Sequence, residues 1–98
     1  AYLGVVTADL STEAIQMYDM PEGAFVIRVE KNSAAGKAGI QKGDIIVSFD
    51  GQTVSGKDDL ESKLAYYASG ETVDVVVSRA DNGEYVQKTI SVTLGSKN

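Results

Sequence analysis

The sequence predicts an α+β domain that is mostly β, with a small antiparallel sheet closed by two or three helices. Three observations support this fold class. Apolar residues alternate with period two in several short runs, the segment 57–69 has helical period instead, and Asn82-Gly83 separates the last two alternating runs. Period-two alternation indicates strands with one buried face. Asn-Gly is the favoured two-residue hairpin turn, because both residues tolerate positive φ.

We expect strands over residues 24–30 and 45–50 and over the two runs that flank the turn, each with every second side chain facing the core. The side chains expected to face inward are Phe25, Ile27 and Val29; Ile45, Val47 and Phe49; Val73, Val75 and Val77; and Val86, Ile90, Val92 and Leu94.

The main helix is expected from Lys57 to Ser69, where Leu60, Leu64, Tyr67 and Ala68 form one apolar stripe. Ser55 and Asp58 resemble a capping box at its start, with Asp in place of Glu. Gly70 supplies a left-handed residue at its end.

Two shorter helical segments complete the prediction. One covers Thr12 to Tyr18 and is stopped by Pro21, and the other is a single turn over residues 33–37. The chain contains no internal repeat, linker or low-complexity stretch, so we expect one domain over residues 1–98. Because the chain opens at Ala1 in sequence that is already strand-like, we expect it to be a fragment of a longer protein.

The composition limits the classes of function. The 98 residues are 43% hydrophobic, which suits a self-sufficient core. Because the sequence has no cysteine and no histidine, it cannot hold a disulfide, a Ser-His-Asp triad, a Cys-His dyad or an ordinary zinc site. A net charge of −5 argues against nucleic-acid binding. No apolar run approaches the length of a membrane span. We predict no catalytic residue, metal ligand or cofactor in this chain.

Two local features stand out. In Tyr2-Leu3-Gly4-Val5, Gly4 lets the backbone turn so that successive N–H groups point the same way, which would form an anion-binding nest. A glycine at this place also fits a bulge or a close-packing position. The second feature is the segment 32–46, rich in small residues and glycine, in which Asp44 can accept hydrogen bonds from nearby N–H groups. We interpret that segment as scaffold.

These residues together resemble the PDZ domains of the HtrA family of trypsin-like serine proteases. Tyr-Leu-Gly-Val resembles the carboxylate-binding loop of that family. Its scaffold is matched in the same order by Gly23-Ala24-Phe25-Val26, Asn32-Ser33-Ala34-Ala35, Ala38-Gly39-Ile40, Gly43-Asp44-Ile45-Ile46 and Asp50-Gly51. The similarity covers essentially the whole chain. It implies a partly open antiparallel β-barrel or sandwich capped by two to three helices, with the strand arrangement of bacterial HtrA proteins.

The resemblance also implies a mechanism. A PDZ-like domain adds an extended peptide to a sheet edge, here residues 4–8, and holds the terminal carboxylate of that peptide in a backbone nest. The implied carboxylate-binding residues are Tyr2, Leu3, Gly4 and Val5. The rest of the groove would consist of Val6 and Thr7 from the strand and Asp59, Lys63 and Tyr66 from the helix. At these three helix residues the chain departs from the family's pattern, so the ligand preference stays open, and a solvated helix face is the alternative.

The expected partners are the C-terminal tails of other proteins, misfolded ones included, and the protease domain of the parent protein. The implied location is the bacterial cell envelope, outside the cytoplasm, with the domain itself soluble and a membrane anchor elsewhere in the parent left open. Two alternatives remain: an assembly element of the protease, and a PDZ domain of a tail-processing or intramembrane protease. A glycosidase-like carboxyl pair among Asp44, Asp50, Asp58 and Asp59 is disfavoured, because each has a turn or helix-start explanation.

Overall fold

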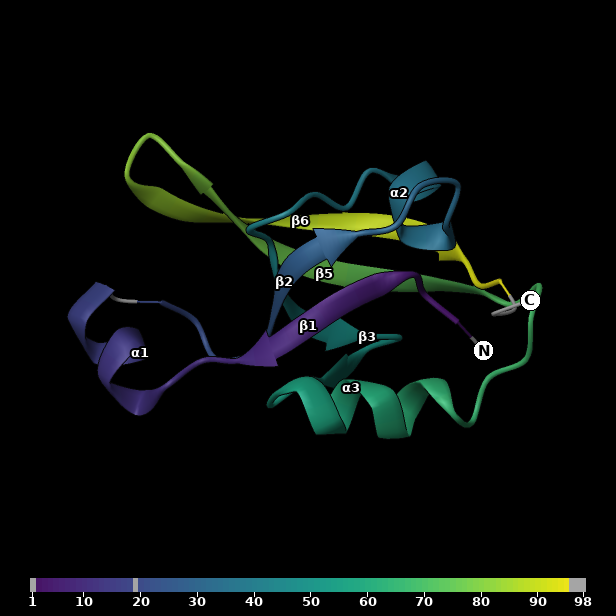
Figure 1. Cartoon of the computed structure of the whole chain (residues 1–98), viewed down its shortest axis with the longest axis horizontal. Helices are drawn as coiled ribbons and strands as arrows, with labels where there is room; N and C mark the ends of the chain where they lie inside the picture. Colours follow the sequence, from purple (N-terminus) through teal and green to yellow (C-terminus); the bar gives the residue numbers. More distant parts are fainter. Residues whose placement is uncertain (1, 19, 96–98) are drawn as a thin grey trace.

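The computed structural model describes residues 2–18 and 20–95. In this range six strands form one sheet in the order β1-β2-β3-β5-β6, with β4 beside β3, and all pairings are antiparallel (Figure 1). The elements are β1 (Val5–Asp9), α1 (Thr12–Tyr18), β2 (Ala24–Val29), α2 (Ala34–Ala38), β3 (Ile45–Phe49), β4 (Gln52–Thr53), α3 (Lys57–Leu64), β5 (Thr72–Asp81) and β6 (Glu84–Thr93). The predicted fold class is confirmed.

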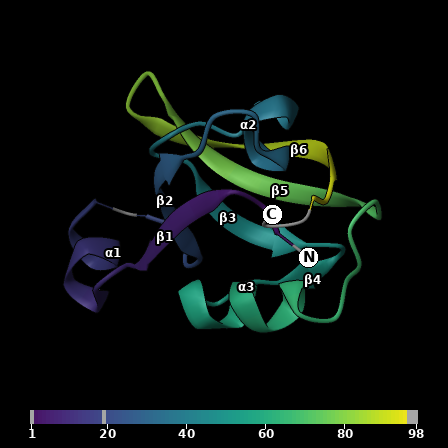
Figure 2. The ribbon, with the colours of Figure 1, turned by 45° about the vertical axis from the view of Figure 1, so that its right-hand side comes forward.

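The helices take different places around the sheet. Seen from the side, α2 and α3 lie on opposite sides of β1, while α1 projects beyond one end of the sheet (Figures 1 and 2). At the other end, the Tyr2 N–H donates to the Gly95 carbonyl at 2.8 Å and the Gly95 N–H donates back at 3.1 Å. This bridge joins the segments that flank the two outer strands, so the sheet curls into a partly open barrel.

The hairpin between β5 and β6 confirms the strongest local prediction. Asn82 and Gly83 both have positive φ, 53° and 83°. The strands on either side pair without interruption from Asp81–Glu84 to Thr72–Thr93. A second turn of this kind, at Asp50-Gly51, precedes the two-residue strand β4, which the alternation of apolar residues did not reveal.

The core is continuous from the sheet to α2 and α3. Its buried apolar members are Leu3, Ala24, Val26, Ala35, Ile40, Ile46, Phe49, Val54, Leu60, Val73, Val75, Val77, Val92 and Leu94. The expected inward face of β5 is confirmed, since Val73, Val75 and Val77 are all buried.

The expected inward face of β2 was wrong. Ala24 and Val26 face the core, Phe25 is only partly buried, and Ile27 is 42% exposed. The cause is a β-bulge: Thr7 pairs with Val26 and the preceding residue of β1 pairs with Arg28, so Ile27 has no partner. An unpaired extra residue shifts the alternation of side chains, and beyond it Val29 packs against the core again.

A similar irregularity alters β3. The register against β5 shifts between Ile46 and Ser48. Ile45 and Phe49 are buried as expected, but Ile46 belongs to the core in place of Val47. At the far end of β6, the expected inward residue Val86 is 41% exposed, because the hairpin tip extends past the core (Figure 1).

Helix α3 ends at Leu64, five residues earlier than predicted. The chain continues in tight turns, with the N–H groups of Tyr66 and Tyr67 bonded to carbonyls three residues before them. Tyr67 still packs on the core: its ring meets Phe49 edge-on with centroids 5.2 Å apart. Gly70 is left-handed as predicted, with φ 95°, but it lies in the following loop and donates its N–H to the Leu94 carbonyl.

A buried carboxylate fixes the loop before β3. Asp44, with 2% of its side chain exposed, accepts the Gln41 N–H at 2.9 Å, so the expected hydrogen bond from a nearby N–H group is present. It also accepts two bonds from the Arg79 guanidinium, at 2.8 and 2.7 Å, and Arg79 donates to the Gly39 carbonyl as well. Asp44 raises the pKa of Arg79 above its usual value. This pair ties the loop to β5.

We expect Asp44→Asn to lower the free energy of unfolding by about 3 kcal/mol, because the Arg79 charge would lose its buried partner. Urea unfolding followed by circular dichroism measures this loss. Asp74→Asn is the matched control, since its side chain is exposed on β5; we expect a change within about 0.5 kcal/mol. Equal losses in the two variants would contradict the structural role of the Asp44–Arg79 pair.

Candidate functional site

The segment before β1 is held in an unusual conformation by close packing. Gly4 has φ +88°, and a Cβ atom on it would lie 2.1 Å from the Cβ of Ser33. Ser33 is itself fixed: it caps α2 by accepting the Gly36 N–H at 3.0 Å, and its hydroxyl donates to the Glu30 carbonyl at 2.7 Å. Only glycine fits here, which combines the two interpretations of this position, a left-handed turn and a close approach.

In this segment the backbone carbonyls of Leu3 and Gly4 are hydrogen-bonded, whereas their N–H groups are not bonded to any described residue. The Leu3 carbonyl accepts the Ala35 N–H at 2.8 Å, and the Gly4 carbonyl accepts the Glu30 N–H at 2.9 Å. Among residues 2–18 and 20–95, by contrast, the N–H groups of Leu3 and Gly4 donate to no acceptor. Two neighbouring amides of one loop are therefore available to a ligand.

Tyr2 borders this loop and is anchored on both sides. Its backbone forms the bridge to Gly95, and its hydroxyl donates a hydrogen bond to the Glu30 carboxylate. That bond raises the pKa of Tyr2, because ionisation would place a second negative charge beside Glu30. The tyrosine ring consequently forms a fixed border of the site.

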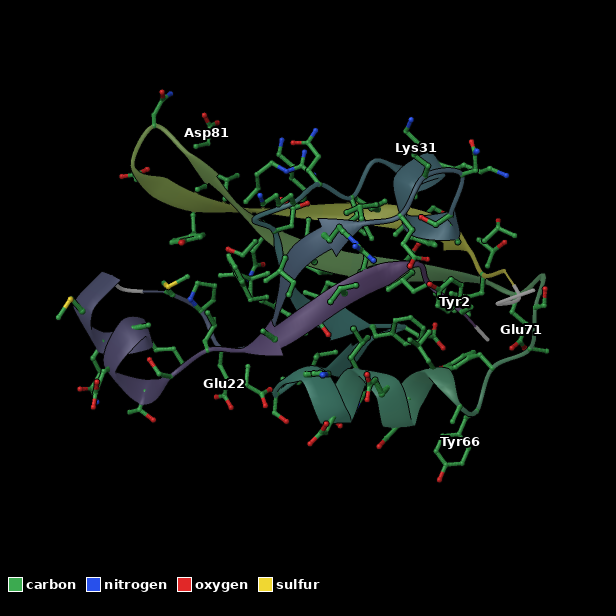
Figure 3. All side chains as sticks on the ribbon, viewed as in Figure 1. Tyr2, Glu22, Lys31, Tyr66, Glu71 and Asp81 are labelled. Atoms are coloured by element: carbon green, nitrogen blue, oxygen red, sulfur yellow. The ribbon has the colours of Figure 1, made fainter. Side chains whose placement is uncertain are left out.

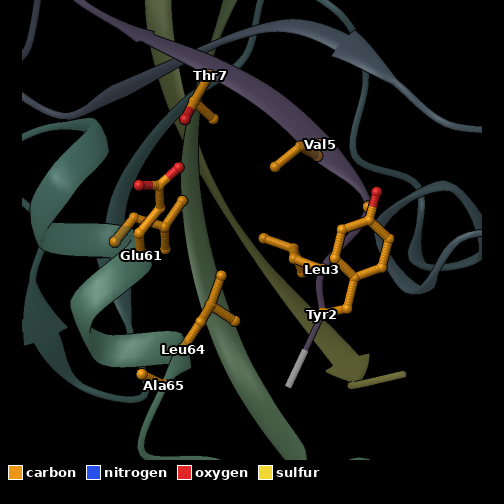
Figure 4. Close-up of a pocket in the computed structure, with 9 residues that line it drawn as sticks. Tyr2, Leu3, Val5, Thr7, Glu61, Leu64 and Ala65 are labelled. Atoms are coloured by element: carbon orange, nitrogen blue, oxygen red, sulfur yellow. The ribbon is translucent and has the colours of Figure 1, made fainter. Parts of the chain in front are cut away.

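β1 is an outer strand of the sheet, paired with β2 on one edge only. Its other edge faces α3 across a groove lined by Tyr2, Leu3, Gly4, Val5, Thr7, Leu60, Glu61, Leu64 and Ala65, with a volume of about 260 Å³ (Figure 4). We call this the β1–α3 groove. Val5 and Thr7 line it, whereas Val6, which was expected there, does not, because successive side chains of a strand point to opposite faces.

The start of α3 is attached to β1. The Asp9 carboxylate, at the end of β1, accepts the Lys57 N–H at 2.8 Å. The predicted Ser55–Asp58 capping box is absent: the N-cap is Gly56, and it is Asp59 that reaches back to the Ser55 N–H at 3.0 Å. Asp9 thus satisfies one of the free N–H groups of the first helical turn, which fixes the helix relative to the strand.

The helix wall of the groove differs from the prediction. It consists of Leu60, which is buried in the core, together with Glu61, Leu64 and Ala65. Leu60 and Leu64 were expected to face the sheet, and they do so at the floor of the groove. Glu61 and Ala65 were not predicted, although their spacing of four residues beside the apolar stripe was visible in the sequence.

Asp59 and Lys63 lie on another side of α3, and Tyr66 lies beyond its end, so their expected place in the groove is corrected. Together with Gln52, Ser62 and Tyr67 they line a separate hollow. Lys63 pairs with Asp59 at 2.7 Å, which lowers the pKa of Asp59. Tyr66 is 89% exposed and points away from the molecule (Figure 3).

Three of the four aspartates considered for a catalytic pair are bonded to other residues instead. Asp44 binds Arg79, Asp59 binds Lys63, and the Asp50 carboxylate accepts the Tyr67 hydroxyl at 2.6 Å. In the described ranges, no three acidic residues gather in a way that could hold a metal ion. No described helix is long and apolar enough to cross a membrane.

Comparison with known proteins agrees with this geometry. The sequence profile described as PDZ domain matches residues 1–94. A probable periplasmic serine endoprotease DegP-like from Marinomonas sp. is 36% identical over 99 residues, which cover 99% of this chain and 20% of the relative. A relative of the same description from Pseudomonas putida is 33% identical over 93 residues, or 93% of this chain and 19% of the relative. The chain spans about a fifth of these proteins.

Solved structures of HtrA proteins have the same fold as this chain. The HtrA-type protease AlgW with a decapeptide superposes with a TM-score of 0.74 at 28% identity, over 99% of this chain and 30% of AlgW. The HtrA3 PDZ domain bound to the phage-derived ligand FGRWV gives a TM-score of 0.75 at 22% identity, over 94% of this chain and 82% of that one. The expected resemblance in sequence and fold is confirmed.

We expect Gly4→Ala to lower the free energy of unfolding by about 2–4 kcal/mol, because it adds a clash with Ser33 to an unfavourable φ. Gly43→Ala is the matched control: Gly43 has φ +94° and nothing within 4 Å of an added Cβ. It should cost only about 1 kcal/mol. Chemical denaturation of both variants tests this difference, and similar losses would mean that the contact with Ser33 is not restrictive.

Proposed function

Because this chain belongs to the PDZ domain family, we propose that it binds the C-terminal tails of other proteins in the β1–α3 groove. We propose further that it is the substrate-recruiting or regulatory domain of a serine endoprotease. The main support for the proposal is that the free amides of Leu3 and Gly4 lie where the unpaired edge of β1 meets a mostly apolar groove. That combination suits a peptide end with a charged carboxylate and an apolar side chain.

The peptide would bind as an additional strand. β1 has one unpaired edge, and an extended segment lying along it would gain main-chain hydrogen bonds from the backbone of Val5 and Thr7. If the carboxylate lies at Leu3 and Gly4, the peptide runs antiparallel to β1. Its last side chain would then enter the part of the groove lined by Leu3, Val5 and Leu64.

The carboxylate would be held by backbone dipoles. The free amides of Leu3 and Gly4, and beside them the amide of Val5, would supply the donors, and Tyr2 lines the end of the site. No lysine or arginine is among the described residues that line the groove. Hydrogen bonds to a charged acceptor are about twice as strong as neutral ones. The free carboxylate is therefore the part of the ligand to which binding should be most sensitive.

The parent protein would carry the hydrolytic chemistry. This chain has no histidine or cysteine, and its curated relatives are serine endoproteases of which it covers about a fifth. We place the parent in the bacterial envelope, since those relatives are named periplasmic. Exposed tails of misfolded proteins and the parent's own protease domain are the proposed partners.

We expect tail binding to require a free carboxylate. Amidation removes the charge and points an NH₂ group at the Leu3 and Gly4 donors, which should weaken two hydrogen bonds. The expected loss is about 2–4 kcal/mol, or roughly 30- to 1,000-fold in affinity. Calorimetric titration of one peptide as acid and as amide measures it. Equal affinities would contradict carboxylate binding by the Leu3 and Gly4 amides. They would favour recognition of internal segments or an assembly role.

We expect Val5→Asp to weaken tail binding by at least about 10-fold, because it removes groove surface and sets a second negative charge beside the carboxylate. Lys63→Ala changes the other side of α3 and should alter affinity less than about 2-fold. Peptide titration of both variants, after thermal unfolding has shown that each is folded, makes the comparison. Similar losses would place the binding site elsewhere.

A further inference from the structure

One charged side chain projects into the β1–α3 groove. Of the described residues that line it, Glu61 alone is charged, and the others are apolar apart from Tyr2 and Thr7. The side chain of Glu61 extends from α3 toward Thr7, at the far end of the groove from Tyr2 (Figure 4). A peptide in the groove would cover this carboxylate.

The charge of Glu61 is not neutralised within the described part of the chain. It forms no ion pair with Lys57, which is one helical turn earlier, and Lys63 is engaged by Asp59 on another side of α3. The Glu61 carboxylate also accepts no hydrogen bond from a described residue. A bound peptide would remove water from the Glu61 carboxylate. If the peptide supplied no hydrogen-bond donor in exchange, the desolvation of this charge would weaken binding.

The register of a bound tail places one ligand residue next to Glu61. This step rests on the proposed function, in which the terminal carboxylate lies at Leu3 and Gly4. Strand side chains alternate and rise about 3.3 Å per residue, so the last residue and the third from the end face the same side, roughly 7 Å apart. With the last residue near Val5, the third from the end lies opposite Thr7 and faces Glu61.

We infer that Glu61 selects tails that carry Lys or Arg at the third residue from the C-terminus. A long cationic side chain at that position can lay its aliphatic part along the groove and bring its charge to the carboxylate. An acidic residue there would place two negative charges together, and an apolar one would desolvate Glu61 without compensation. The groove would therefore recognise two side chains of a tail, an apolar one at the last residue and a cationic one at the third residue from the end.

The test begins with peptides that have free C-termini and are randomised at the last four positions, selected on this chain and then sequenced. The original chain should enrich Lys and Arg at the third residue from the end. Glu61→Gln should lose that enrichment while keeping the preference for an apolar last residue. Glu61→Lys should enrich Asp and Glu instead. Glu84→Gln, which removes the same charge at the distant hairpin, is the matched control and should select as the original chain does.

Titration of one selected peptide with Lys, Ala or Glu at that position gives the size of the effect. We expect roughly 10-fold between Lys and Glu in the original chain, and about 2-fold or less in Glu61→Gln. The difference should shrink as NaCl rises from about 0.05 to about 1 M. Selection of free-acid tails with no preference at the third residue would overturn this inference and leave the proposed function standing. Failure to prefer free-acid over amidated peptides would overturn the proposed function, and this inference with it.

Discussion

Gly4 lies against Ser33 so closely that no side chain fits between them, and the arrangement of the groove follows from this contact. With φ at +88°, the chain turns its Leu3 and Gly4 carbonyls toward the N–H groups of Ala35 and Glu30. Because those carbonyls are fixed on the protein side, the neighbouring amides stay free. Helix α2, through its serine cap, thus fixes the backbone at the Leu3–Gly4 end of the groove, although the residues of α2 do not line the groove.

The position of α3, the wall of the groove opposite β1, is fixed by a second long-range contact. Asp9 closes β1 and caps the first turn of α3, so one strand both forms the edge of the groove and positions the helix across from it. Gly56 makes this possible, since a Cβ there would lie 2.5 Å from the Asp9 carboxylate. Burial of Leu60 then holds the helix against the core. The spacing between β1 and α3 is therefore determined by contacts within the domain, at Asp9 and at Leu60.

Sequence reasoning succeeded where the signal was local. The Asn82-Gly83 hairpin, the residues of α1 and the alternation of β5 all depend on conformational preferences of neighbouring residues. It failed for the inward face of β2, because the bulge at Ile27 arises from pairing with β1, and no residue in the run marks it. The Asp9 cap and the Asp44–Arg79 pair were also out of reach, since each joins residues more than thirty positions apart.

The error in the helix wall has a different cause. Beside the apolar stripe of α3 there are two flanks, one with Asp59 and Lys63 and the other with Glu61 and Ala65, and both have the spacing of one helical turn. Helical periodicity cannot distinguish them. The choice is made by the sheet order: β1 is an outer strand, and only the flank of α3 turned toward its free edge can meet a ligand there.

The floor of the groove and the hydrophobic core share residues. The residues that hold α3 on the core, Leu60 and Leu64, also form the apolar floor of the groove, so they cannot vary without affecting stability. Glu61 follows Leu60 in the helix; it is exposed, lines the groove and contributes little to the core. Substitutions at Leu60 or Leu64 should therefore change both the stability of the domain and the floor of the groove, whereas substitutions at Glu61 should change the charge of the groove without disturbing the fold.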